Sequence, residues 1–337
     1  MTEMVNEQSE RERHIRAYGA MILSRTLDRK IITAQRQGRV GFYTPSMGQE
    51  AGQIGLSMAL DKDDLLFQYY RDVALMIHRG VPIETLINQV MGNNEDLARG
   101  RQMPSHFLAE EQNFMSVQSP VATNLPLAVG AAYAVKYRKE SRIVVASFGE
   151  GSSSTPDFHA ALNMAAVWNL PIIFFCENNG WAISLPVEKQ TKVDIWRKAE
   201  AYGIKGLYAD GNNIDESYRV AQEAVEHVRS GKGPVLMEVR FFRMGPHSTS
   251  DDPTKYQTDI VKEGDERDPV VINEKLFKEK GYLTDEVMEK IKAESNRIVN
   301  EKFDACEKIE GPAPETMFQD VYEKMPWNIK EEMEEIL

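Results

Sequence analysis

Arg142-Ile143-Val144-Val145-Ala146-Ser147-Phe148-Gly149-Glu150-Gly151 is the stretch of sequence that decides the fold. Its apolar run is typical of a strand buried on both faces, and its glycines allow a tight turn at the end of that strand. A helical pattern at residues 157–168 and a second buried strand at 171–176 follow. Strand, helix and strand in this order predict a parallel sheet that is covered by helices on both faces.

The same alternation extends outward from this unit in both directions. Further strands are predicted at residues 64–70, 207–209 and 235–241, and helices at 11–37, 48–60, 122–139, 215–229 and 285–307. We therefore predict an α/β fold, a parallel sheet flanked by helices, with helical N-terminal and C-terminal extensions. Residues 1–337 are expected to form one large domain, with a mainly helical extension (1–60), an α/β core (61–245) and a loop followed by helices (246–337).

Composition excludes several classes of protein. The chain has 40 Lys and Arg against 52 Asp and Glu, a formal charge of -12, which argues against a nucleic-acid-binding surface. Its two cysteines provide neither a disulfide framework nor a zinc site. No apolar run approaches the roughly 18 residues of a membrane helix, and the polar N-terminus lacks the apolar segment of a secretory signal. We expect a cytoplasmic protein that binds neither nucleic acid nor membrane.

Polar residues follow both of the strands that define the sheet. Glu150 lies between two glycines after the first strand, and Asn178-Asn179 follow the second. The 26 residues between Gly151 and Asn178 allow one helix and one strand, so both turns reach the same crevice at the carboxyl ends of the strands. Carboxylate and amide oxygens suit Mg²⁺, and the glycines let a phosphate approach the backbone. Either segment alone could be an ordinary turn, but together they predict a Mg²⁺-phosphate site.

The two turns together resemble the thiamine diphosphate motif, with Glu150 in place of the usual Asp. Several other segments, in the same order, are similar to alpha subunits of 2-oxo acid dehydrogenases, and especially to the branched-chain type. These segments are Phe42-Tyr43, Gly48-Gln49-Glu50, Gly100-Arg101-Gln102-Met103-Pro104, Ser119-Pro120-Val121-Ala122-Thr123, 171–176 and His247-Ser248-Thr249-Ser250-Asp251-Asp252. The resemblance implies a thiamine diphosphate-binding fold, with Mg²⁺ held by Glu150, Asn179 and the carbonyl of Trp181.

The resemblance also implies a set of cofactor contacts. These are Tyr70, Arg71, Ser119, Val121, Gly149, Glu150, Gly151, Asn179 and His247. Catalytic roles are implied for His247 and Tyr70, and Arg71 corresponds to a diphosphate ligand. The alternative for Arg71 is a surface residue paired with Asp72. Ser119 and the carbonyl of Val121 correspond to aminopyrimidine contacts, and Tyr70 and Val121 would also line the substrate pocket.

Besides Glu150, three segments depart from the family pattern. Glu177 precedes Asn178-Asn179, where relatives often have a phosphate-binding arginine, so the phosphate depends more on Mg²⁺, Arg71 and His247. Thr155-Pro156 stands where relatives have an acidic or amide residue and a glycine; proline fits the first turn of a helix. Thr123 and Asn124 match positions that some relatives use for a structural K⁺, although Asn124 stands where glutamine is usual.

The function implied by the resemblance is oxidative decarboxylation of branched-chain 2-oxo acids with reductive acyl transfer to lipoyl groups. The implied partners are a beta subunit, in an α₂β₂ assembly, and a lipoyl-bearing acyltransferase. Alpha subunits of pyruvate or acetoin dehydrogenase and a non-catalytic Mg²⁺-diphosphate-binding subunit remain alternatives. The small-residue helices around Gly52 and Gly130 are candidates for the contact with the beta subunit; ordinary packing within the chain is the alternative. No Gly-x-Gly-x-x-Gly follows a strand, which disfavours a dinucleotide enzyme.

Overall fold

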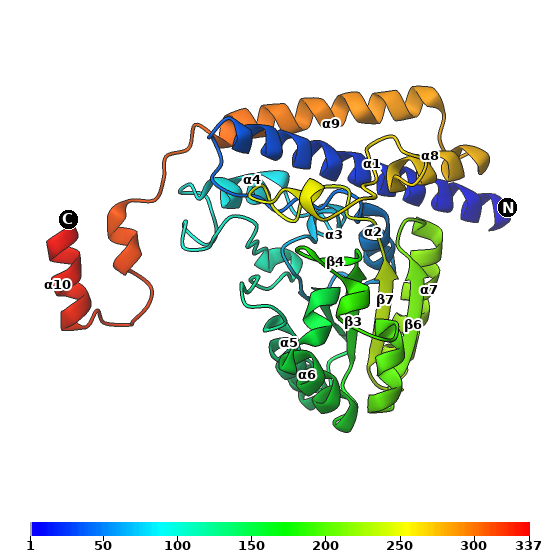
Figure 1. The fold of residues 1–337 in the computed structure, drawn as a ribbon, viewed down its shortest axis with the longest axis horizontal. Coiled ribbons are helices and arrows are strands. Elements are labelled where there is room, and N and C mark those ends of the chain that lie inside the picture. Colours follow the sequence, from blue (N-terminus) through cyan, green and yellow to red (C-terminus); the bar gives the residue numbers. More distant parts are fainter. Residues whose placement is uncertain (1) are drawn as a thin grey trace.

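A five-stranded parallel sheet lies at the centre of the computed structural model, which describes residues 2–337 (Figure 1). Its order is β1 (Leu65–Phe67), β2 (Val144–Gly149), β3 (Ile172–Asn178), β7 (Val235–Arg240) and β6 (Lys205–Asp210). Every neighbouring pair is parallel. The predicted parallel sheet is confirmed, and its three central strands are those with continuous apolar runs.

Helices cover both faces of this sheet. On one face lie α5 (Asn124–Arg138) and α6 (Pro156–Val167), and on the other lie α2 (Glu50–Ala59) and α7 (Ile214–Arg229). Successive residues of β3 alternate between two apolar clusters: Ile173 and Phe175 pack on the side of α2 and α7, whereas Phe174 packs on the side of α5 and α6. A strand that is apolar at every position is therefore buried on both faces.

The two ends of the chain form a helical layer above the sheet (Figure 1). Helix α1 (Thr2–Arg36) lies beside α9 (Asp285–Cys306) and α8 (Pro269–Glu279), and α10 (Trp327–Ile336) extends away from this body. Arg25 of α1 is buried and bonds Glu50 at 2.7 Å and Asp268 at 3.1 Å, which ties α1 to α2 and α8. The predicted helical extensions are confirmed, whereas domain limits at residues 60 and 245 stay a prediction.

Several short elements differ from the predicted pattern. Strand β1 is shorter than the predicted 64–70, because the chain leaves the sheet at Gln68, whose side chain donates to the carbonyl of Phe107 at 3.1 Å. Helices α3 (Val73–His78) and α4 (Ile83–Met91) were not predicted, nor was the hairpin of β4 (Trp181–Ala182) and β5 (Leu185–Pro186). The short 3₁₀ helices are η1 (Glu110–Gln112), η2 (Glu150–Ser154), η3 (Val187–Lys189), η4 (Ile195–Tyr202), η5 (Pro253–Lys255) and η6 (Pro314–Phe318).

The two helix glycines singled out in the sequence have different surroundings. A Cβ on Gly52 would lie 2.5 Å from ring atoms of Phe241, so this glycine lets α2 pack closely within the chain. A Cβ on Gly130 would meet nothing within 4 Å. Of the two interpretations given for these helices, contact with another subunit or packing within the chain, the second holds for Gly52. Gly130 lies on the surface of α5. No helix within residues 2–337 is both long and apolar enough to cross a membrane.

Candidate functional site

The turn after β2 places a buried carboxylate at the end of the sheet. Glu150 begins η2 and is only 2% exposed. A Cβ on Gly151 would lie 2.9 Å from the Cβ of Ala182, so the turn and the β4–β5 hairpin approach too closely for a side chain there. Oε2 of Glu150 accepts a hydrogen bond from the backbone N–H of Asn179 at 3.3 Å. The two turns predicted to share a crevice therefore do meet.

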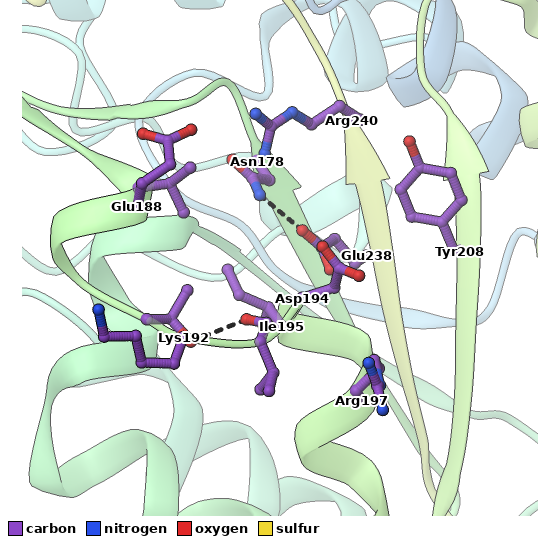
Figure 2. A pocket seen from close by; sticks show the side chains of 12 residues that line it. Asn178, Glu188, Lys192, Asp194, Ile195, Arg197, Tyr208, Glu238 and Arg240 are labelled. Atoms are coloured by element: carbon purple, nitrogen blue, oxygen red, sulfur yellow. Dashed lines mark hydrogen bonds between the residues drawn. The ribbon is translucent and has the colours of Figure 1, made fainter.

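The two asparagines at the end of β3, Asn178 within the strand and Asn179 just after it, face opposite ways. Asn178 Nδ2 donates to Oε1 of Glu238 at 2.5 Å, and Figure 2 shows both side chains in a neighbouring cavity of about 480 Å³. Arg240, at the end of β7, also lines that neighbouring cavity (Figure 2). Asn179 instead lines the cavity that contains Glu150. The second asparagine is thus the one placed to act with Glu150, as the sequence predicts.

All ten residues predicted for the site line a single cavity of about 450 Å³. They are Tyr70, Arg71, Ser119, Val121, Gly149, Glu150, Gly151, Asn179, Trp181 and His247. They come from chain segments that follow β1, β2, β3 and β7 and from the loop before α5. Val121 is 60% exposed, which leaves this side of the cavity open to the outside of the chain. We call this cavity the half-site.

Arg71 brings a buried positive charge to the half-site. Its guanidinium is 1% exposed and donates to the carbonyl of Pro45 at 2.5 Å and to the carbonyl and Nδ1 of His247 at 2.7 and 3.0 Å. No carboxylate of the side chains that the structure describes (residue 8 and residues 10–337) forms an ion pair with it, and Asp72 instead accepts from the backbone N–H of Tyr69 at 3.2 Å. The alternative of a surface arginine paired with Asp72 is therefore wrong. An unpaired buried guanidinium suits a phosphate ligand.

His247 is held neutral and in one tautomer. A guanidinium can only donate, so Nδ1 of His247 is the acceptor toward Arg71 and the ring proton lies on Nε2. Burial, followed by the nearby positive charges of Arg71 and Arg243, lowers the pKa of His247 to about 3. The ring of Tyr70 meets that of His247 edge-on, with centroids 6.0 Å apart. His247 therefore offers an N–H donor at neutral pH without carrying a charge.

Arg243 is a second buried cation that the sequence analysis did not identify. It follows β7, is 2% exposed, and donates to the carbonyl of Ile183 at 2.8 Å and to the hydroxyl of Tyr256 at 2.6 Å. Its charge affects both Glu150 and His247, so it lies close to the half-site. Its position just beyond the carboxyl end of a buried strand was the signal available in the sequence.

Glu177, which stands where relatives often have an arginine, points away from the half-site into the protein. Its Oε2 accepts from the side-chain amides of Gln49 and Gln53, both at 2.8 Å. Burial and the neighbouring Asp72 carboxylate raise the pKa of Glu177 well above its usual range. A side chain turned toward α2 does not line the half-site, so this departure does not place a carboxylate in the cavity. Gln49 also accepts from Nδ2 of Asn179 at 3.5 Å.

The oxygen donors of the half-site fit a hard divalent cation. Among the side chains that the structure describes (residue 8 and residues 10–337), no three of His, Cys, Asp or Glu are clustered so as to hold a metal, so a metal here needs amide or carbonyl oxygens as well. Glu150, Asn179 and the Trp181 carbonyl are such a set. Burial raises the pKa of the Glu150 carboxyl group, and Arg71 and Arg243 oppose that rise. A cation bound beside Glu150 would favour its charged form.

Two of the remaining predicted positions, Ser119 and Asn124, line the half-site and bond to other parts of the chain. Ser119 Oγ is 2.5 Å from Nε2 of His106, a partner that the sequence analysis did not identify. Asn124 lines the half-site, and its Nδ2 donates to the carbonyls of Phe67 and Ser147 at 3.1 and 2.8 Å, which links β1 to β2. These bonds give Asn124 a structural role, and a K⁺ site at Thr123 and Asn124 stays a prediction.

Known proteins resemble this chain over most of its length. The Dehydrogenase E1 component family matches residues 18–315. The human 2-oxoisovalerate dehydrogenase subunit alpha, mitochondrial, is 38% identical over 329 residues, which is 97% of this chain and 74% of the relative. The Caenorhabditis elegans protein of that name is 39% identical over 96% of this chain and 75% of its own length. Subunit alpha 1 of Arabidopsis thaliana is 37% identical over 94% and 68%. The resemblance is confirmed, and the chain belongs to the dehydrogenase E1 component family.

Proposed function

We propose that this chain is the alpha subunit of a branched-chain 2-oxo acid dehydrogenase and holds the Mg²⁺-diphosphate end of thiamine diphosphate. The observation that carries this proposal is the convergence of ten residues, predicted from separate segments, on one cavity. Membership of the E1 family implies dependence on thiamine diphosphate. Relatives that cover most of this chain are named for 2-oxoisovalerate, a branched-chain 2-oxo acid, which supports the substrate class.

The polar residues of the half-site have two tasks in this proposal, binding of the metal and binding of the diphosphate. Glu150, Asn179 and the Trp181 carbonyl hold Mg²⁺, while Arg71 and the Nε2–H of His247 donate to the diphosphate. Bound thiamine diphosphate supplies the electron sink that decarboxylation requires. Because His247 is neutral, its donor strength is constant across the neutral pH range.

Apolar and aromatic side chains also line the half-site. Tyr70 and Val121 are among them, and Ser119 lines the same cavity, so these residues would contact the aminopyrimidine ring and the side chain of the substrate. Val121 is 60% exposed, and a reacting centre needs protection from water. We infer that a second chain closes this side.

The surface next to the opening supports a protein partner. Helix α5 starts three residues after Val121 and exposes Leu127, Tyr133 and Tyr137 beside Gly130, with exposed fractions of 48%, 49% and 80% for the three large side chains. Exposed apolar side chains grouped on one helix mark a contact surface. In our proposal a beta subunit packs here in an α₂β₂ assembly, and a lipoyl-bearing acyltransferase accepts the acyl group.

One experiment tests the substrate class. The chain is produced together with its beta subunit, and decarboxylation of 3-methyl-2-oxobutanoate and of pyruvate is measured with Mg²⁺ and thiamine diphosphate present. We expect preference for the branched substrate and no comparable turnover by the chain alone. Strong preference for pyruvate would instead support a pyruvate or acetoin dehydrogenase, and turnover by the isolated chain would contradict the shared site.

A pair of glutamates tests the metal-binding role. Glu150→Ala is expected to abolish Mg²⁺-dependent binding of thiamine diphosphate and turnover, whereas Glu188→Ala, an exposed residue of the neighbouring cavity, should change neither. If the Glu150 variant keeps both cofactor affinity and turnover, the ligand role is wrong. Cofactor binding without turnover by the native complex would support a non-catalytic binding subunit.

Two properties stay predictions within this proposal. A K⁺ requirement is expected only if Thr123 and Asn124 bind the ion, and replacing K⁺ by Na⁺ in the assay tests it. The sequence predicts a cytoplasmic chain, whereas the relatives above carry mitochondrial in their names. Fractionation of the producing cells distinguishes the two locations.

A further inference from the structure

A second cavity, separate from the half-site, lies between α1, α2, α3 and η1 and has a volume of about 670 Å³. Its lining residues Leu60 and Lys62 precede β1, whereas Tyr70 and Arg71 of the half-site follow that strand. The two cavities are therefore at opposite ends of β1. Helices α1, α2 and α3 lie side by side in this part of the fold (Figure 1). We call this space the helical cavity.

Positive charge predominates around the helical cavity, although the chain as a whole is strongly acidic. Arg16, Lys62 and Arg79 line it, against one acidic residue, Glu111. Arg79 donates to the carbonyls of Asp61 and Lys62, both at 3.0 Å. Where the structure describes side chains (residue 8 and residues 10–337), none of the three cations has a carboxylate partner within ion-pair distance, and the Asp61 carboxylate is paired with an arginine of α7 at 2.9 Å. The carboxylates of Asp64 and Asp61 lie near Arg79. In a chain of formal charge -12, three cations against one acidic residue in the lining of a cavity still favour an anionic ligand.

The side chain of His78, which also lines the helical cavity, is affected by the positive charges of Arg16 and Arg79. Its Nδ1 lies 2.7 Å from Oγ of Ser57, and its Nε2 has no hydrogen-bond partner in the described part of the chain. Burial, and then the charges of Arg16 and Arg79, lower the pKa of His78 to about 4. Two guanidinium groups thus act on a single imidazole in the wall of the cavity.

Part of the wall is apolar, beside the polar side chains of Ser57 and Gln112. Ala20 and Leu23 of α1, Leu60 after α2 and Ile77 of α3 provide it. Inorganic phosphate would gain nothing from these side chains, whereas an anion with a hydrocarbon body would bury apolar surface against them. Charge and wall together therefore favour an amphipathic anion.

We propose that the helical cavity binds a small organic carboxylate with a short aliphatic body. The carboxylate lies among Arg16, Lys62 and Arg79, and the aliphatic part packs against Leu23 and the neighbouring apolar wall. This site goes beyond the function proposed above and does not depend on it, because it shares no residue with the half-site.

The test uses the assembled complex with Mg²⁺ and thiamine diphosphate present, so that the half-site is filled. Calorimetry measures binding of 4-methylpentanoate, of the neutral 4-methylpentanamide and of inorganic phosphate. Exposed Arg16 and Lys62 are changed to glutamine, singly and together; Arg36→Gln, an exposed arginine on the same helix, is the matched control. Melting temperature and turnover confirm that each variant is folded.

We expect the carboxylate to bind at least about tenfold more tightly than the amide, a difference of about 1.4 kcal/mol. The double variant should lose most of that affinity, and Arg36→Gln should lose none. Equal binding of the amide, binding of phosphate alone, or no binding of 4-methylpentanoate would overturn the proposal. So would binding that both cavity substitutions leave unchanged, because the ligand would then lie elsewhere, for example in the substrate pocket.

Discussion

The substitution Arg71→Met removes the buried guanidinium of the half-site while keeping an unbranched side chain of similar length. A guanidinium has five N–H groups. Three of those in Arg71 donate to the carbonyl of Pro45 and to the carbonyl and Nδ1 of His247. The others remain free to meet a diphosphate oxygen.

The size of the effect follows from these unused donors. A hydrogen bond to a charged group contributes about 1.5–3 kcal/mol. Loss of one such bond to the diphosphate weakens binding by about 10- to 150-fold, since roughly 1.4 kcal/mol corresponds to a factor of ten. Arg71→Lys keeps the charge but not the fork of donors, so we expect an intermediate loss.

The assay titrates thiamine diphosphate at fixed Mg²⁺ against the reconstituted alpha–beta complex, following turnover and intrinsic fluorescence. Arg240→Met is the matched control, because Arg240 lines the neighbouring cavity rather than the half-site (Figure 2). Circular dichroism verifies the fold of each variant. A change of less than about threefold for Arg71→Met, or an equal change for both variants, would refute the assignment of Arg71 as a diphosphate ligand.

Three further predictions concern packing, protonation and metal. Gly52→Ala places a Cβ 2.5 Å from the Phe241 ring and should lower the free energy of unfolding by about 1–3 kcal/mol. Gly130→Ala, with nothing within 4 Å of its Cβ, should raise the free energy of unfolding by about 0.5–1 kcal/mol. Urea denaturation measures both free energies, and equal effects of the two substitutions would contradict the packing described. The pKa of His247 is lowered to about 3, so between roughly pH 6.5 and 3 the His247 ring binds a proton only in the unfolded chain. The stability of the folded chain therefore falls as pH falls through this range. His247→Asn should reduce this loss of stability, which urea midpoints measured across the same pH range would detect. A chelator should weaken binding of thiamine diphosphate to the native complex but have little further effect on Glu150→Gln, and an equal effect on both would exclude metal binding through Glu150.

The elements that the sequence predicted well are those whose own residues determine their environment. Strands β2 and β3 are apolar at nearly every position, and this pattern fits only a sheet covered on both sides. The placement of Glu150 and Asn179 in one cavity followed from the same pattern, because parallel strands bring their carboxyl ends together. Local sequence was therefore sufficient for the centre of the fold and for the main turns of the site.

Contacts between distant residues account for what was not predicted. Strand β1 stops at Phe67 because Gln68 bonds to the remote loop that contains Phe107. The orientation of Glu177 depends on Gln49 and Gln53, more than a hundred residues earlier in the chain. The role of Arg243 depends on the β4–β5 turn that it contacts through Ile183. None of these partners is visible in the local pattern of the sequence.

The pairing of α1 with α9 has a consequence for biosynthesis. Leu27 and Ile31 of α1 are buried in the apolar cluster that also contains Val299 and Phe303 of α9. About 250 residues separate the two helices, and translation at about 5–20 residues per second takes roughly 12–50 s to cover them. Throughout that time α1 has left the ribosome without its packing partner α9. A nascent chain that stops before residue 285 would present an uncovered apolar face to chaperones and to other unfinished chains.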